Sequence, residues 1–185
     1  VFPVTIDPTF VGYINQNNAP AMDTWVISGQ TSSNASHDQL RVGTVNNGDT
    51  FARSLLRFNL PPTGNGTTNV ADAQLSLFAE ESQSCTATPV TVGGMNAPFD
   101  GNTVWSNQPG AYGPVTSTST NKGGGSGCAD GRFDLEVTDL VESWLTGTAV
   151  HNGFRLRAGN ESLNSNRKVF TSGNTENTAN QPRLT

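Results

Sequence analysis

Short runs in which apolar and polar residues alternate recur along the chain, separated by turn residues. In Ala73–Glu80, for example, Ala73, Leu75 and Leu77 share one parity and polar residues lie between them. A period of two is typical of strands that bury one face, and the Gly, Asn and Pro clusters between the runs predict turns. The predicted strands are Val4–Ile6, Asp23–Ser28, Gln39–Val45, Arg53–Leu60, Ala73–Glu80, Val90–Val92, Arg132–Thr138, Asn152–Ala158, Lys168–Ser172 and Arg183–Thr185.

One segment has the period of a helix instead. Its apolar stripe consists of Leu140, Val141, Trp144 and Leu145. Asp139 followed three residues later by Glu142 predicts a capping box, and Gly147 predicts the end of the helix. We therefore expect a short helix over about residues 139–146, lying against one end of the strands with Trp144 in the core.

Strands at this spacing, without intervening helices, are typical of an all-β fold with two packed antiparallel sheets. The length of 185 residues suits one domain with a single core. We expect one β-sandwich domain over residues 1–185, with residues 1–14 as a lead-in segment or an N-terminal strand. We also expect the chain to be a piece of a longer polypeptide, because both ends resemble interrupted strands.

The composition narrows the classes of function. Charged residues make up 14% and apolar residues 34% of the chain, and Thr, Asn, Ser and Gly are abundant. This composition excludes a helical bundle, which needs many Ala, Leu, Glu and Lys residues. The formal net charge of −5 disfavours a nucleic-acid partner, and no apolar run is long enough to span a membrane.

Two cysteines bear on the compartment. Cys85 and Cys128 each lie in a polar segment, and an even number of cysteines in such a chain suggests one disulfide in an exported protein. The alternative is a pair of buried free thiols. The glycine-rich Lys122–Gly127 next to Cys128 predicts a mobile loop tip.

An ordered set of motifs resembles a known family. The set runs DTWV, LRVG, RSLLRFNL, AQLSLF, WSNQP, FDLEVTDLVESWLTGT, NGFRLRAGNES and PRLT, over Asp23–Thr185. It resembles the DNRLRE domain family, also called disaggregatase-related, which is treated as a carbohydrate-binding module of jelly-roll type. The lead-in PVTIDPT and the GGGSGC loop resemble the form found in secreted or wall-associated actinobacterial proteins, some with RHS repeats. The resemblance implies a jelly-roll β-sandwich that binds polysaccharide outside the cell and has no catalytic role.

Catalytic chemistry has little support in the sequence. His37 and His151 both lie in turn-like segments, where a solvated histidine is expected. Asp134 and Glu136 share one strand face side by side, whereas a glycosidase needs two carboxylates facing each other. We therefore predict a protein that is not an enzyme and requires no cofactor.

Arginines on the strands suggest a binding surface. In Asn152–Ala158, Phe154 and Leu156 share the core parity, so Arg155 and Arg157 face outward. The same argument turns Arg41, Arg53, Arg57 and Phe78 outward, and the Gly- and Pro-flanked Tyr112 is the aromatic residue most suited to exposure. The predicted carbohydrate-binding residues are Arg41, Arg53, Arg57, Phe78, Arg155, Arg157 and Tyr112.

Guanidinium groups bind carboxylate, phosphate or sulfate with two hydrogen bonds, so this surface would suit an acidic glycan such as a uronate or wall teichoic polymer. The alternative is an internal lattice in which Arg155 and Arg157 pair with Asp134, Glu136 or Glu80 on neighbouring strands.

A structural calcium ion is a further hypothesis, because jelly-roll modules commonly hold one. The candidate ligands are Asp7, Asp23, Asp49 and Asp100. None of them lies in a D-x-[DN]-x-[DN]-G loop, so capping of a turn is the alternative role for each.

These observations predict a secreted, cell-surface module that binds polysaccharide and anchors a larger protein to a cell wall or matrix. The rival hypothesis is a structural domain of a surface protein, fibre or RHS-type shell without a glycan ligand. The alternating N-terminal segment up to Ile14 motivates this rival, because it could complete the sheet of a neighbour.

Overall fold

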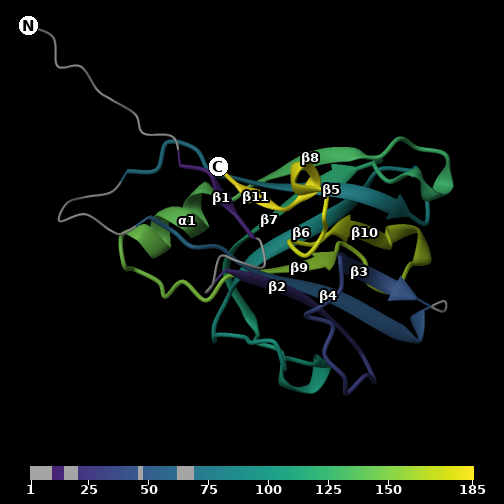
Figure 1. Ribbon diagram of the computed structural model, residues 1–185, viewed down its shortest axis with the longest axis horizontal. Coiled ribbons are helices and arrows are strands. Elements are labelled where there is room, and N and C mark those ends of the chain that lie inside the picture. Colours follow the sequence, from purple (N-terminus) through teal and green to yellow (C-terminus); the bar gives the residue numbers. More distant parts are fainter. Residues whose placement is uncertain (1–9, 15–20, 46–47, 62–68) are drawn as a thin grey trace, which may run out of the picture.

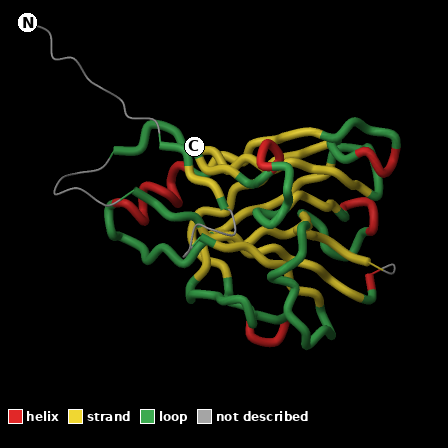
Figure 2. Tube along the Cα trace, in the orientation of Figure 1, coloured by secondary structure: helices red, strands yellow, loops and turns green. Residues whose placement is uncertain are grey.

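The computed structural model describes residues 10–14, 21–45, 48–61 and 69–185 (Figure 1). The predicted strand Val4–Ile6 lies outside these residues. The strands run along the long axis of the molecule, and Figure 2 shows loops and short helical turns gathered around their ends. The two-sheet, all-β prediction with one short helix is confirmed, while the jelly-roll connectivity stays a prediction.

Two antiparallel sheets contain the described strands. Besides the end of β3 (Gln39–Val45), sheet B contains β2 (Met22–Ile27), β4 (Thr50–Arg57), β9 (Phe154–Ala158), β6 (Thr88–Met95) and β7 (Ala111–Thr120), in this order. Sheet A is built around β5 (Gln74–Ser82), which pairs with β8 (Gly131–Glu136) on one edge and with β10 (Lys168–Thr171) and β11 (Arg183–Leu184) on the other. β1 (Gly12–Tyr13) pairs with β11 of the same chain.

β3 (Gln39–Val45) joins the two sheets. Its first half pairs with β10 in sheet A, and from Gly43 onward it pairs with β4 in sheet B. Gly43 has a φ of +94°, and a Cβ there would lie 2.9 Å from the Cα of Arg167. A glycine is therefore required where the strand changes sheets.

The core lies between the sheets and follows the predicted parity. Sheet A contributes Leu75, Leu77 and Ala79, and sheet B contributes Leu56 and Phe154, all fully buried or nearly so. Alternate residues of each strand point to opposite faces, so the residues between them face outward. This alternation decides where the charged side chains of both sheets lie.

The helix forms where it was predicted, but its first turn differs. α1 spans Thr138–Leu145, and its N-cap is Val137, which makes no side-chain cap bond. The predicted cap at Asp139 is wrong, because Asp139 lies within the first turn and the backbone N–H of Thr138 bonds to Oε1 of Glu136 instead. Gly147, with a φ of +74°, follows the helix end as expected.

α1 covers one end of the sheets (Figure 1). Leu140, Val141 and Trp144 enter the core, so the predicted burial of Trp144 is confirmed.

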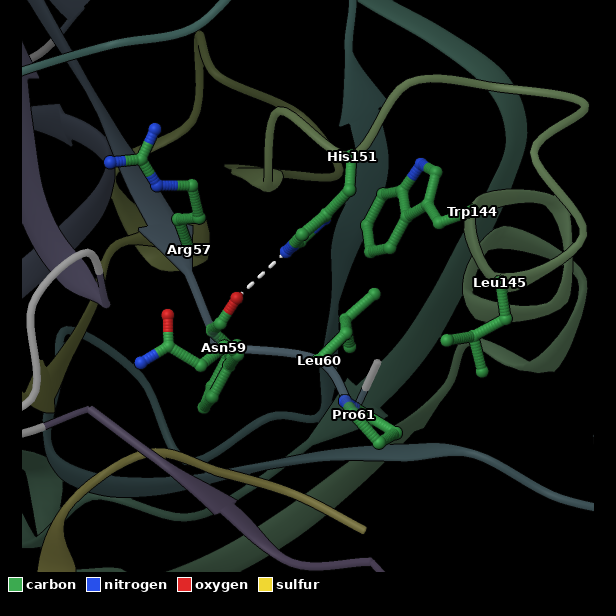
Figure 3. Close-up of a pocket in the computed structure, with 8 residues that line it drawn as sticks. Arg57, Asn59, Leu60, Pro61, Trp144, Leu145 and His151 are labelled. Atoms are coloured by element: carbon green, nitrogen blue, oxygen red, sulfur yellow. Dashed lines mark hydrogen bonds between the residues drawn. The ribbon is translucent and has the colours of Figure 1, made fainter. Parts of the chain in front are cut away.

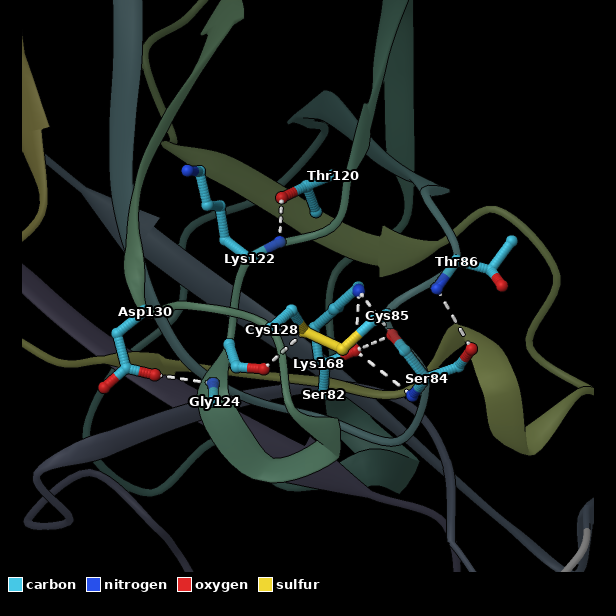
Figure 4. The surroundings of a disulfide bond; sticks show 11 residues. Ser82, Ser84, Cys85, Thr86, Thr120, Lys122, Gly124, Cys128, Asp130 and Lys168 are labelled. Atoms are coloured by element: carbon cyan, nitrogen blue, oxygen red, sulfur yellow. Dashed lines mark hydrogen bonds between the residues drawn. A yellow bond between two sulfur atoms is a disulfide. The ribbon is translucent and has the colours of Figure 1, made fainter.

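A disulfide joins Cys85 to Cys128 near the far ends of β5 and β7 (Figure 4), which confirms the predicted bridge. The glycine-rich segment beside it is not a free loop tip. A Cβ on Gly123 would lie 2.7 Å from the backbone of Glu81, so the segment packs closely against β5. Beside the bridge, Lys168 is fully buried and its Nζ donates to Oγ of Ser82 at 2.6 Å.

Candidate functional site

Four of the five predicted outward arginines lie on the outer face of sheet B. Arg53 and Arg57 come from β4, where Leu55 between them also faces away from the core. Arg155 and Arg157 come from the adjacent β9, and Arg155 pairs directly with Leu55. These four arginines therefore face away from the core, as predicted, and share one surface.

A loop covers half of this face. Residues 96–110, between β6 and β7, fold over β2 and β4 and bury a small second core of Val26, Leu55, Met95 and Phe99. Arg53 and Arg57 border this covered half. The guanidinium of Arg53 lies over the ring of Trp105 at 4.6 Å, and that of Arg57 lies 5.8 Å from the ring of Phe99.

Arg53 also forms an ion pair that the sequence did not predict. Its Nε and Nη2 donate to the two carboxylate oxygens of Glu161 at 2.8 and 2.9 Å. This two-point geometry fixes the guanidinium and neutralises its charge. Arg53 is thus held by its surroundings rather than offered to a ligand.

Arg155 and Arg157 occupy the open half of the face. Nη1 of Arg155 donates to the carbonyl of Pro109 at 3.1 Å, and the side chain of Arg157 is exposed. Neither forms an ion pair within the part of the chain that the structure describes. Burial lowers the pKa of the Arg155 guanidinium, and the charges of Arg53 and Arg157 lower it further, partly offset by Glu161. Three guanidinium groups, of Arg53, Arg155 and Arg157, therefore act on one another here, and the carboxylate of Glu161 that offsets them is paired with Arg53.

The predicted alternative, in which Arg155 and Arg157 pair with Asp134, Glu136 or Glu80, does not form among the residues that the structure describes. Asp134 and Glu136 lie on β8 of sheet A, and Glu80 lies on β5 of the same sheet, where its carboxylate accepts from Gln39 at 2.8 Å. These acids belong to the opposite sheet from Arg155 and Arg157.

A hollow of about 220 Å³ lies beside the two open arginines. Its lining consists of Thr91, Val92, Gly93, Ala111, Val115, Arg155 and Arg157. Val115 is 55% exposed, so the hollow has an apolar wall as well as two cationic ones. Val115 could not be singled out from the sequence, since β7 was not predicted, and Gly93 lies just beyond the predicted strand Val90–Val92.

The remaining predicted site residues lie elsewhere. Nη2 of Arg41 donates to Gln39 on sheet A, and its guanidinium lies 4.7 Å from the ring of Trp25. Phe78 is on β5 of sheet A, opposite Arg132. Tyr112 pairs with Gly94 on the core parity, and its hydroxyl accepts from Nε1 of Trp144 at 2.8 Å. The structure thus does not bring these three residues to the arginine face.

A second hollow, of about 490 Å³, lies at the α1 end (Figure 3). His151 and Trp144 line it, with Arg57, Asn59 and Leu60 opposite. The rings of His151 and Trp144 pack on each other, with centroids 4.4 Å apart.

His151 is not the solvated histidine that the sequence predicted. Its Nε2 donates to the carbonyl of Phe58 at 2.7 Å (Figure 3), and burial lowers its pKa. The prediction for His37 is confirmed, since its side chain is exposed.

Metal ligands do not cluster in the described residues, where no group of three His, Cys, Asp or Glu side chains could hold an ion. Both carboxylate oxygens of Asp23 are bonded, to Oγ of Ser172 at 2.8 Å and to the N–H of Gly173 at 2.7 Å. Asp100 caps its own turn through the N–H of Asn102. Asp7 lies outside the described residues.

The model of carbohydrate-binding module family 96 matches residues 15–185. The chain belongs to this family. A comparison with curated proteins found no match. The match thus identifies the chain as a carbohydrate-binding module. The disulfide of this family 96 module fits an extracellular protein, and no helix among the described residues is long and apolar enough to cross a membrane.

Proposed function

We propose that this family 96 module is a non-catalytic, extracellular domain that binds acidic polysaccharide through the open half of the outer face of sheet B. The observation that carries the proposal is the pair Arg155 and Arg157. They lie two residues apart on the same outer face of β9, and neither forms an ion pair with a carboxylate in the described chain. A polyanion would supply the missing negative charge.

The geometry supports acidic rather than neutral glycans. Arg53 lies over the ring of Trp105 and Arg57 over the ring of Phe99, which leaves these two rings less available for stacking on a neutral sugar. Arg155 is oriented in advance by Pro109, which reduces the side-chain entropy lost on binding. A carboxylate or phosphate could then bind across both guanidinium groups.

The resemblance to DNRLRE domains of secreted actinobacterial proteins supports a location at a bacterial cell surface. In that setting the module would anchor a larger protein to wall or matrix glycan. A structural calcium ion stays part of this proposal, and an unchanged melting temperature in the presence of a chelator would remove it.

The decisive experiment measures binding of the isolated module to polygalacturonate, wall teichoic acid and neutral dextran by calorimetry at rising salt. We expect binding to an acidic polymer that weakens as the ionic strength rises. Replacing Arg155 and Arg157 together by Ala should weaken binding by at least about tenfold, equivalent to about 1.4 kcal/mol. Lys122→Ala removes one charge from another part of the molecule and serves as the control.

Three other results would change the proposed role of the two arginines or of the module. Replacing both arginines by Lys keeps the charge but removes the planar guanidinium that can form two parallel hydrogen bonds. An unchanged affinity would therefore mean that the positive charge alone, and not the hydrogen-bond geometry, determines binding. An affinity that does not respond to salt would remove the acidic ligand. Absence of binding to every glycan would favour the structural rival.

A further inference from the structure

Gly93 and Gly94 are adjacent on β6, but they face opposite sides of sheet B and have different surroundings. Gly94 faces the core, where an added Cβ would lie 3.0 Å from Cζ of Tyr112 and 3.1 Å from Cδ2 of Leu140. These contacts are tighter than ordinary packing, and a side chain at position 94 would have to displace Tyr112 or Leu140, so packing of the core favours Gly94. Gly93 faces the other way, toward the arginine surface, because it pairs with Arg155.

The backbone conformation at position 93 does not require a glycine, although Gly93 lies where the pairing of β6 with β7 shifts register, between Val92 and Gly94. Its φ is not among the positive values of the chain. An added Cβ would lie 3.4 Å from Cβ of Ala111 and 3.6 Å from Cγ2 of Val115, which are ordinary van der Waals distances. Glycine in a strand costs stability and often marks either a bulge or a place where another molecule approaches the backbone closely. A register shift alone tolerates a small side chain here, because an added Cβ meets its neighbours only at ordinary contact distance.

The missing side chain creates the floor of the hollow. Gly93 lies between the guanidinium-bearing Arg155 and Arg157 on one side and the exposed Val115 on the other. A volume of about 220 Å³ is below the ~300–1,000 Å³ of pockets that enclose drug-sized ligands. The hollow therefore suits one small ring of a polymer that continues over the surface on both sides.

We propose that Gly93 is a specificity-determining residue, whose bare Cα lets one sugar ring of the bound glycan lie flat against the sheet. The C–H face of the ring would contact Gly93, Ala111 and Val115, while its acidic group binds Arg155 and Arg157. Rings whose faces carry bulky substituents are excluded by the same floor. This inference rests on the proposed function, since it concerns the same surface.

The test uses steric blocking, which leaves every charge in place. Polygalacturonate is titrated into the wild-type module and into Gly93→Ala and Gly93→Val variants. We expect Gly93→Ala to weaken the affinity for polygalacturonate by about tenfold or more, because one extra carbon in a pocket has an effect of this size. We expect no detectable binding for Gly93→Val. Melting temperatures should be equal to or above that of the wild type, because Gly is unfavourable in a strand.

A matched control is available at Gly101, in the loop between β6 and β7. Its φ is also not positive, and an added Cβ would meet only Cβ of Ala35 at 3.9 Å. Gly101→Ala should leave both the affinity and the melting temperature unchanged. As a second measurement, polygalacturonate O-acetylated on its ring hydroxyls should bind the wild type more weakly than the unmodified polymer.

The outcomes separate the two proposals. Wild-type binding that is lost in the Arg155→Ala, Arg157→Ala double variant but retained in Gly93→Val overturns the role of Gly93 and leaves the arginine site intact. Equal binding of the acetylated polymer also overturns it. Absence of wild-type binding to polygalacturonate overturns both proposals for uronate ligands.

Discussion

The hydroxyl of Tyr112 on β7 accepts a hydrogen bond from Nε1 of Trp144 on α1 at 2.8 Å and lies 3.2 Å from the carbonyl of Val150. This bond ties the helix to the edge strand of sheet B. It also gives the indole N–H of Trp144 a hydrogen-bond acceptor, which this group needs because Trp144 is only 5% exposed. Tyr112 thus has a structural role on the side of the sheet away from the arginines.

We predict that Tyr112→Phe lowers the free energy of unfolding by about 1–3 kcal/mol, because it leaves a buried donor unsatisfied. Urea unfolding followed by Trp fluorescence measures this change. Glycan affinity should stay at the wild-type value. A loss of affinity at unchanged stability would instead return Tyr112 to the binding site.

The second prediction concerns the bridge between Cys85 and Cys128, which closes a loop with a sequence separation of 43. On the chain-entropy model a loop of this length contributes about 4 kcal/mol. The double variant Cys85→Ala, Cys128→Ala should lose that amount in urea unfolding, and the reduced wild type should show the same loss. A double variant as stable as the oxidised protein would show that the close packing of Gly123 on β5 is sufficient without the bridge.

Most strands could be predicted because their core positions are apolar. Gln39–Val45 has the predicted bounds, since Leu40 and Val42 alternate with polar residues. β7 could not be predicted, because the residues that it turns toward the core are Thr116, Thr118 and Thr120, opposite Val92, Val90 and Thr88. A strand with polar residues on both faces leaves no hydrophobic period to detect.

The binding face could be predicted only in part, for two physical reasons. Parity shows that Arg53 and Arg155 leave the core, but it does not show which sheet a strand joins. Arg41 belongs to the half of β3 that pairs with β10, so it leaves the surface formed by the other four arginines. The ion pair between Arg53 and Glu161 joins residues 108 positions apart, which no local pattern reveals.

The ion pair between Arg53 and Glu161 lies beside Arg155, so its removal should change glycan binding. Glu161→Gln removes the negative charge that acts on Arg155 and leaves Arg53 without its ion pair. Stability should fall by about 1–3 kcal/mol because charged hydrogen bonds are lost. Affinity for polygalacturonate should rise severalfold at low salt, since the face becomes more positive, and the gain should vanish at high salt.

Asp134→Asn provides the matched control, because it removes one carboxylate from an exposed position on sheet A. Its affinity for polygalacturonate should remain that of the wild type. If both variants gain equally, net charge rather than the outer face of sheet B determines binding.

The fourth prediction concerns the buried Asp23. Burial raises its pKa from 3.8 to about 6, against the lowering effect of its bonds to Gly173 and Ser172. A folded-state pKa above the unfolded value means that folding favours the protonated carboxyl. This stabilisation is fully present below pH 3.8 and is lost as the pH rises through about 6, a change on the order of 3 kcal/mol.

Asp23→Asn should remove this dependence while keeping the shape of the side chain. An Asn oxygen can accept from the N–H of Gly173, and its amide can donate to Oγ of Ser172. Relative to wild type, the variant should therefore gain stability between pH 4 and pH 7, as measured by urea unfolding at each pH. Parallel stability profiles for the two proteins would mean that Asp23 is already ionised at low pH in the folded state, held so by its two hydrogen bonds despite its burial.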